Sequence, residues 1–169
     1  MQRLWSGWRS EYVTGNASSD GCIFCRFPQE ERDEGNLLLH RGDRAYIILN
    51  RFPYNPGHVM VVPYEHIGRM ADLPPQTMLE MMRLVQLCVG ALERGFGAQG
   101  FNIGMNLGRC AGAGVPDHLH IHVVPRWVGD VNFMPSLADV KVIPERLEES
   151  YHKLKEALVD ELRGAGAGG

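Results

Sequence analysis

Three histidines separated by single apolar residues, His118, His120 and His122, are the strongest chemical signal in the sequence. This alternation has the period of a β-strand, so the three imidazoles are expected to share one face of that strand. At a rise of about 3.3 Å per residue, the outer two lie about 13 Å apart, too far for both to bind one metal ion through bonds of about 2 Å. At least one imidazole is therefore free for nucleophilic attack at phosphorus or for general acid and base catalysis.

Cys22 and Cys25 form a CxxC motif, which is the strongest metal-binding signal. Two thiolates on a tight turn can both bind one tetrahedral zinc ion, whereas a redox CxxC normally opens a helix within a βαβ unit, a setting that this sequence lacks. Zinc then needs two more ligands, and the candidates are His40, His58, His66 and one histidine of the triad. His66 follows a predicted strand, and His118 would leave the other two histidines of the triad free.

A glycine-rich loop, residues 107–117, precedes the triad. Gly108, Gly112 and Gly114 allow backbone N–H groups to turn toward an anion, as a phosphate requires in a site that is short of lysine. Glycines are equally common in ordinary hairpin loops, and neither a P-loop nor a dinucleotide-binding GxGxxG pattern occurs. The loop is thus a candidate phosphate site because of its position beside the histidines, not because of its composition.

The periodicity of apolar residues predicts an α+β fold, in which an antiparallel sheet meander packs with one long and one C-terminal helix. Gly42 and Asp43 are a tight-turn signal between the first two strands. The strands are expected at residues 37–41, 45–49, 58–63, 101–106 and 118–124, and the helices at 74–95 and 144–163. The long helix has Met82 and Val89 in its apolar stripe, and this stripe is wider than a half-buried helix needs, which suggests a subunit interface.

The composition fits one globular domain, since 44% of the 169 residues are hydrophobic and 22% are charged. A net charge of -3 argues against nucleic acid as the main partner. No segment has the pattern of a signal peptide or a membrane span, so a cytoplasmic location without membrane attachment is expected. Four cysteines in such a chain favour thiols or metal ligands over disulfides, and Cys88 and Cys110 are expected to be packing thiols.

Taken together, these motifs resemble the histidine triad (HIT) superfamily of nucleotide hydrolases and transferases. The resemblance rests on the H-φ-H-φ-H-φ-φ pattern at 118–124, on Asn50 followed by N-P-G-H at 55–58 and the strand after it, and on the CxxC motif. The flanks, residues 4–12 and 127–144, are similar to the branch of bacterial diadenosine tetraphosphate phosphorylases. The expected division of the chain is an N-terminal arm (1–21), a HIT-like catalytic domain (22–127), a C-terminal extension with a helix (128–163) and a tail (164–169).

The resemblance implies that His120 attacks the α-phosphorus of a nucleoside polyphosphate, and that water or inorganic phosphate then releases the nucleotide from the histidine. It implies a homodimer and assigns roles to further residues. His122 and His58 form the hydrogen-bonded surroundings, Asn50 meets the ribose, Asn106 with the loop amides around Gly112 and Gly114 holds the phosphate, and Cys22, Cys25, His66 and His118 bind a structural zinc ion.

One departure from the family pattern concerns the acceptor. Many members have Gln and then Ser or Thr just before the triad, whereas this chain has Ala113, Gly114 and Val115. The leading hypothesis is a nucleotidyl transferase or hydrolase that cleaves dinucleoside polyphosphates, most like a phosphorylase. The alternatives are a nucleoside phosphoramidate hydrolase, a non-catalytic nucleotide-binding module and a metallohydrolase with its ion on the triad.

Overall fold

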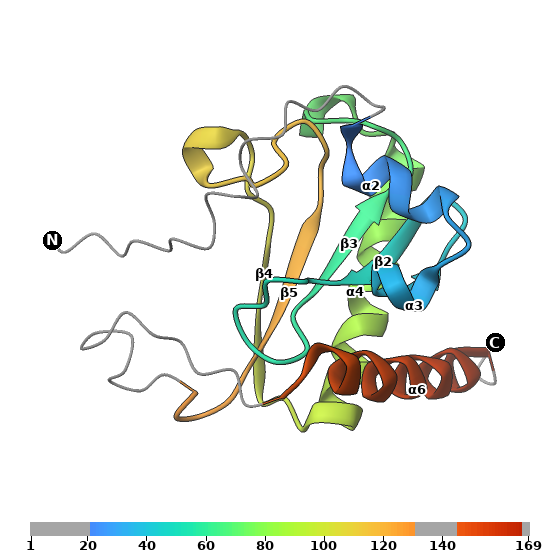
Figure 1. The fold of residues 1–169 in the computed structure, drawn as a ribbon, viewed down its shortest axis with the longest axis vertical. Coiled ribbons are helices and arrows are strands. Elements are labelled where there is room, and N and C mark those ends of the chain that lie inside the picture. Colours follow the sequence, from blue (N-terminus) through green and yellow to red (C-terminus); the bar gives the residue numbers. More distant parts are fainter. Residues whose placement is uncertain (1–20, 131–144, 167–169) are drawn as a thin grey trace, which may run out of the picture.

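The computed structural model describes residues 21–130 and 145–166, which form an antiparallel sheet packed with helices (Figure 1). The predicted N-terminal arm and part of the predicted C-terminal extension lie outside the described residues, and the division of the chain stays a prediction. The elements in order are α2 (Ile23–Arg26), η3 (Phe27–Gln29), α3 (Asp33–Asn36), β1 (Leu38–Arg41), β2 (Ala45–Leu49), β3 (Val59–Pro63), η4 (Met70–Asp72), α4 (Pro75–Phe96), β4 (Gly100–Gly104), η5 (Arg109–Ala111), β5 (Ile121–Arg126) and α6 (Leu147–Gly166).

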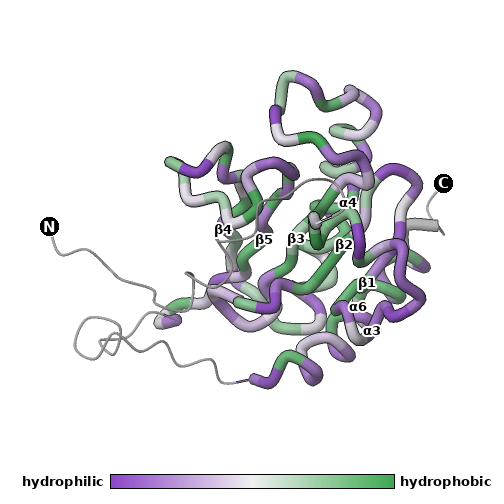
Figure 2. Tube along the Cα trace, turned by 45° about the horizontal axis from the view of Figure 1, so that its top comes forward, coloured by the Kyte–Doolittle hydropathy of each residue, from purple (hydrophilic) through white to green (hydrophobic). Residues whose placement is uncertain are grey.

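The sheet has the strand order β1-β2-β3-β5-β4, and every neighbouring pair is antiparallel. The first three strands form the predicted meander; β5 then pairs with β3, and β4 lies at the edge. All residues of β2 and β3 are buried, which matches their nearly continuous runs of apolar residues. Figure 2 shows these hydrophobic strands in the middle of the molecule, with hydrophilic segments around them. The α+β prediction is confirmed.

The histidine strand differs from its prediction. β5 begins at Ile121, so that of the three histidines only His122 belongs to the sheet ladder. The segment before it bonds elsewhere: the amide of His118 donates to the carbonyl of Val115 at 3.4 Å, and the amide of Leu119 donates to the carbonyl of Ile67 at 2.7 Å. The prediction of one strand over 118–124 was therefore wrong at its start, because local alternation cannot show where the partner strand ends.

The other element boundaries shift by a few residues. β4 spans Gly100–Gly104 instead of 101–106, and α6 begins at Leu147, later than the predicted 144. The hairpin between β1 and β2 has the expected position, and the amide of Gly42 donates to the carbonyl of Ala45 at 2.9 Å. No helix in the described part of the chain is long and apolar enough to cross a membrane.

The long helix α4 lies along one face of the sheet, and α6 crosses the molecule beside it (Figure 1). Only part of the wide apolar face expected from the sequence is buried: Met81, Val85 and Leu92 are buried, whereas Met82 is 46% exposed. Leu79 on the same outer side is 54% exposed. α6 fixes the other side of α4, where Arg94 donates to Glu161 at 2.6 Å. The helix therefore keeps an uncovered apolar strip.

Gly57 shapes the turn that leads into β3 and His58. Its φ of 77° lies in the left-handed region, and a Cβ there would approach the Leu92 side chain to 2.8 Å. Replacing it with alanine should lower the free energy of unfolding by about 2 kcal/mol, which combines the left-handed backbone penalty with a forced shift of Leu92. The measurement is urea unfolding.

Gly97 provides the matched control for this substitution. Its φ is 60°, but a Cβ there would meet nothing within 4 Å, so Gly97→Ala should cost only the backbone term of about 1 kcal/mol. Equal losses in the two variants would contradict the packing argument at Gly57.

Candidate active site and metal centre

The four predicted metal ligands converge in the structure. The ligand atoms of Cys22, Cys25, His66 and His118 all lie within 4.8 Å of one another, and they form the one such His, Cys, Asp and Glu group found among the described residues. The Nδ1 atom of His118 is 3.3 Å from the Cys22 sulfur and 3.5 Å from the Cys25 sulfur. The Nδ1 atom of His66 is 3.2 Å from the Cys25 sulfur.

Three pieces of local structure bring these residues together. The CxxC motif opens α2, where the amides of Cys25 and Arg26 both donate to the carbonyl of Cys22, so the two sulfurs lie on one side of a single turn. The bond between the Leu119 amide and the Ile67 carbonyl ties the segment of His66 to that of His118. A Cβ on Gly68 would approach the Asp117 Cα to 2.9 Å, so these two segments are in close backbone contact.

The geometry and chemistry of this group fit a tetrahedral ion. Bonds of about 2.3 Å to sulfur and 2.0 Å to nitrogen place neighbouring ligand atoms about 3.5 Å apart, close to the observed separations. The Nε2 of His118 donates to the carbonyl of Pro63 at 2.8 Å, which leaves Nδ1 as the coordinating nitrogen. Burial lowers the pKa of His118 to about 4, so its ring is neutral at pH 7.

Burial and the neighbouring Cys22 raise the pKa of Cys25 to about 11, so this thiol is protonated at pH 7 when no cation is bound. A metal ion that bound here would displace the proton, because the thiolate is the ligand. His40 and His58, the other two candidate ligands, lie outside the group. Of the two expected packing thiols, Cys88 is buried, but Cys110 is exposed on η5, so that prediction was wrong for Cys110.

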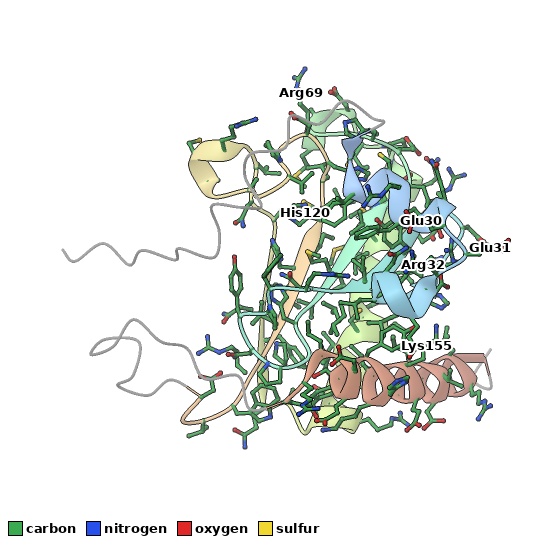
Figure 3. The ribbon with its side chains drawn as sticks, in the orientation of Figure 1. Glu30, Glu31, Arg32, Arg69, His120 and Lys155 are labelled. Atoms are coloured by element: carbon green, nitrogen blue, oxygen red, sulfur yellow. The ribbon has the colours of Figure 1, made fainter. Side chains whose placement is uncertain are left out.

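The four predicted metal ligands Cys22, Cys25, His66 and His118 are called the metal group below. His120 lies between this group and His122. Figure 3 shows it near the upper end of β5, on the side of α2. Its side chain is 5% exposed, and its ring centroid is 5.1 Å from that of Phe24 and 4.8 Å from that of His122. The Nδ1 of His120 is 2.9 Å from the carbonyl of His118. Because a carbonyl oxygen can only accept, Nδ1 carries the proton and Nε2 keeps its lone pair.

Burial lowers the pKa of His120, which keeps its ring neutral near pH 7. A neutral imidazole with a fixed Nδ1 proton and an unprotonated Nε2 is the form that attacks an electrophile. His118, whose ring is one of the four predicted metal ligands, thus orients His120 through its backbone carbonyl.

His58 and His122 form a hydrogen-bonded pair, in which His58 Nε2 is 3.0 Å from His122 Nδ1. The amide of Tyr54 donates to His58 Nδ1 at 3.1 Å, so in the neutral ring the proton of His58 lies on Nε2 and points to His122. The Asn50 side-chain amide is 3.3 Å from His58 Nδ1. His122 accepts at Nδ1, and its neutral ring therefore carries a proton on Nε2.

The glycine-rich loop is placed before the histidines, as expected. Gly108 and Gly112 have φ values of 80° and 86°, a backbone conformation that explains why glycine stands at these two positions. Within the described residues, no hydrogen bond joins Asn106 or Gly114 to the histidines. Their predicted contacts with phosphate thus stay predictions.

Sequence reasoning missed a polar cluster at the end of β5. Asp130 accepts two bonds from Arg126, one from Asn55 and one from the Trp127 amide. The hydrogen bonds from Arg126, followed by those from Trp127 and Asn55, hold the pKa of Asp130 well below its usual range. The charged pair Arg126 and Asp130, four residues apart just after the triad, was a visible signal, but nothing in the sequence linked it to Asn55.

Comparisons with known proteins agree with this geometry. A family model described as the HIT domain matches residues 32–128. The AP-4-A phosphorylase of Mycobacterium tuberculosis is 39% identical over 162 residues, which cover 91% of this chain and 83% of that protein. The asymmetrical bis(5'-nucleosyl)-tetraphosphatase of Schizosaccharomyces pombe is 33% identical over 107 residues, or 63% of this chain and 56% of that protein.

The fold is also found in solved structures. A zinc-bound histidine triad family protein from Mycobacterium smegmatis matches with a TM-score of 0.70 and 32% identity, over 88% of this chain and 99% of that one. A hypothetical histidine triad nucleotide-binding protein from Sulfolobus tokodaii matches with a TM-score of 0.66 and 25% identity, over 85% and 93% of the two chains. With the family model covering more than half of its residues and the three histidines in three distinct settings, this chain belongs to the HIT, or histidine triad, family.

Proposed function

We propose that this protein cleaves dinucleoside polyphosphates such as diadenosine tetraphosphate through a nucleotidyl-histidine intermediate, with inorganic phosphate as the acceptor. The observation that carries the proposal is the hydrogen bond from His120 Nδ1 to the His118 carbonyl, which leaves Nε2 as a nucleophile. The names of two relatives support the substrate class, since one is an AP-4-A phosphorylase and the other a bis(5'-nucleosyl)-tetraphosphatase.

In the first step, the lone pair of His120 Nε2 forms a bond to the α-phosphorus, and the bond from that phosphorus to its bridging oxygen breaks. ATP leaves from diadenosine tetraphosphate, and AMP stays on the ring. The His118 carbonyl, which accepts a hydrogen bond from Nδ1–H of His120, stabilises the positive charge that the imidazole gains. In the second step, an oxygen of inorganic phosphate attacks the same phosphorus, the nitrogen–phosphorus bond breaks, and ADP is released.

His58 and His122 support these steps electrostatically. The proton on Nε2 of His122 is a donor suited to a phosphate oxygen, and His58 fixes this tautomer through its own Nε2. Asn50, beside His58, is proposed to meet the ribose. Amides of the loop around Gly112 and Gly114, with Asn106, are proposed to hold the phosphate in place of the hydroxyl that many relatives have before the triad.

Zinc is the ion proposed for the Cys22, Cys25, His66 and His118 group. The donor set and its spacing support it, as does the zinc-bound relative from Mycobacterium smegmatis. The role proposed for the ion is structural, since His120 and His122 are outside the group. This arrangement disfavours a metallohydrolase with its ion on the triad. The use of reduced thiols as ligands supports a cytoplasmic location as part of the proposal.

A homodimer is also part of the proposal. Ile103 on the edge strand β4 is 47% exposed, and Leu79 and Met82 on α4 are also exposed. The sheet edge and the outer side of α4 thus both present apolar side chains that a second protein surface could cover. A second copy of the chain is proposed to cover them. Sedimentation at micromolar concentration should give the mass of two chains, and a monomer mass would contradict this part.

Product analysis tests the proposed reaction. Purified protein is incubated with diadenosine tetraphosphate, with and without inorganic phosphate, and the nucleotides are separated by chromatography. ADP with ATP, formed only when phosphate is present, is the expected result. AMP with ATP in both samples would assign water as the acceptor, and no cleavage in either would contradict the proposed activity.

A further inference from the structure

The loop that carries His58 is tied to the end of β5 by a cluster of four polar residues, which we call the Asp130 cluster: Asn55, Asn102, Arg126 and Asp130. Arg126 donates to the two carboxylate oxygens of Asp130 from Nε at 2.6 Å and from Nη2 at 2.8 Å. Its third nitrogen, Nη1, donates to Asn102 on the edge strand at 2.7 Å. Such a bidentate pair fixes both position and orientation.

Asn55 connects this cluster to the histidines. Its side chain is 7% exposed and its Nδ2 donates twice, to Asp130 and to the carbonyl of Pro125, each at 2.9 Å. The backbone carbonyl of Asn55 accepts the amide of His58 at 3.1 Å. The carboxylate of Asp130 is thus connected to the backbone of His58 through the Asn55 side chain and the turn from Asn55 to His58.

The two anchored elements carry the two members of the histidine pair. His122 lies on β5, the strand that ends at Arg126, and His58 follows the turn that Asn55 pins to the same strand end. The bond between His58 and His122 spans 3.0 Å, so a displacement of a few tenths of an ångström in either element changes it. Reactions in fixed sites are sensitive to such displacements.

The pair has a second function besides stability. The Arg126 side chain is 38% exposed and that of Asp130 is 11% exposed, so this bidentate pair also contributes to stability. In addition, Asp130 accepts a hydrogen bond from the buried Asn55 amide, which donates its second bond to the Pro125 carbonyl on β5. The cluster therefore fixes the Asn55 turn relative to the end of β5.

We propose that Asp130 is a positioning residue, which acts through Asn55 to hold His58 against His122. The kinetic part of this inference rests on the proposed function, whereas the structural part does not. Asp130→Asn keeps the size of the side chain but replaces one acceptor oxygen with an NH2 group. This group is a donor, so it cannot accept the N–H bonds that Arg126 or Asn55 donates to the carboxylate. It should lower kcat for diadenosine tetraphosphate by about 10- to 100-fold and change KM by less than about threefold.

Glu161→Gln is the matched control. Arg94 donates to Glu161 from two nitrogens, at 3.2 and 2.6 Å, and the carboxylate side chain is 24% exposed, but this pair joins α4 to α6. It should leave both kcat and KM unchanged. Thermal unfolding should show both variants to be fully folded at the assay temperature, so that a fall in kcat reports positioning and not loss of folded protein.

A double-mutant cycle with Asn55→Ala tests the route. If Asp130 acts through Asn55, adding Asp130→Asn to the Asn55→Ala protein should lower kcat by less than about twofold further. Fully multiplicative losses would overturn the route through Asn55, provided that urea unfolding shows each variant to be folded under assay conditions.

Histidine ring nitrogen shifts in 15N-labelled protein give a readout that does not depend on substrate. Asp130→Asn should move the signals of His58 and His122, while that of His152, exposed on α6, stays in place; Glu161→Gln should move neither His58 nor His122. Unchanged signals of both active-site rings would overturn the positioning role even if the activity fell. If the wild-type protein does not cleave the substrate, the proposed function fails, and these shifts still decide the inference.

Discussion

Replacing His120 with alanine is expected to lower nucleotide release from diadenosine tetraphosphate by about a thousandfold or more. The variant loses the attacking nitrogen, and no neighbouring group takes its place, because His118 faces the metal group and His122 accepts a bond from His58 at its Nδ1. The initial rate measured by chromatography gives the loss. Intact-protein mass spectrometry should show the mass of one adenylyl group on the wild-type protein after a short reaction without phosphate, and none on the variant.

His152→Ala is the matched control for this substitution. His152 is 60% exposed on α6, where it lies 3.3 Å from Glu34 and contacts the Tyr151 ring, so its removal should leave the rate unchanged. Zinc content and far-ultraviolet circular dichroism should be the same in both variants as in the wild type. Wild-type rates in His120→Ala, or an adenylyl group on that variant, would rule out His120 as the nucleophile.

Loss of the metal group should have the largest effect on stability. Cys25→Ser removes a thiolate ligand and should abolish zinc binding in protein purified without chelator. Zinc present at a thousandfold excess over its Kd stabilises the folded state by about 4 kcal/mol, and the variant should lose about that amount in urea unfolding. A strong chelator should destabilise the wild type by a similar amount and should have no further effect on Cys25→Ser.

Cys110→Ser separates the loss of a metal ligand from the loss of any thiol. Cys110 is exposed on η5 and outside the metal group, so this variant should keep one zinc ion per chain and the wild-type stability. Metal analysis that finds no zinc in reduced, unchelated wild-type protein, or an equal zinc content in both variants, would contradict the assignment. Because His118 links the two sites, Cys25→Ser should also reduce turnover.

The sequence allowed the site residues to be chosen mainly through residue type and local spacing. Thiols in a CxxC pattern outside a βαβ unit favour a metal over a redox pair, and residue order alone made His66 and His118 the favoured further ligands. The structure brings these four residues together, while His40 and His58 stay outside the group. The assignment of His120 as nucleophile came from the family resemblance, and the geometry now supports it through the His118 carbonyl.

The local pattern of apolar and polar residues was less informative about where a strand begins and which side of a helix is buried. It placed three histidines on one strand, whereas β5 begins only at Ile121 and His118 turns into the metal group. It also gave α4 an apolar face that included both Met81 and Met82, and could not tell that Met81 is buried in this chain while Met82 is 46% exposed. In both cases the alternatives differ by a small rotation or shift, and contacts with distant elements select between them.

The sequence by itself determined the fold class, the approximate positions of strands and helices, the two signature motifs and the resemblance to the histidine triad family, because these depend on residue type and on periods of a few residues. The family resemblance already implied three roles for the three histidines, and the tertiary structure decided the contacts behind them: His118 lies among the predicted metal ligands, the His118 carbonyl fixes the tautomer of His120, and His122 pairs with His58. The tertiary structure also decided that Asp130 reaches Asn55, 75 positions away. The physical reason is that hydrogen-bond direction and ring tautomer depend on which distant carbonyl, amide or carboxylate each side chain meets, and only the packed sheet brings those groups within reach.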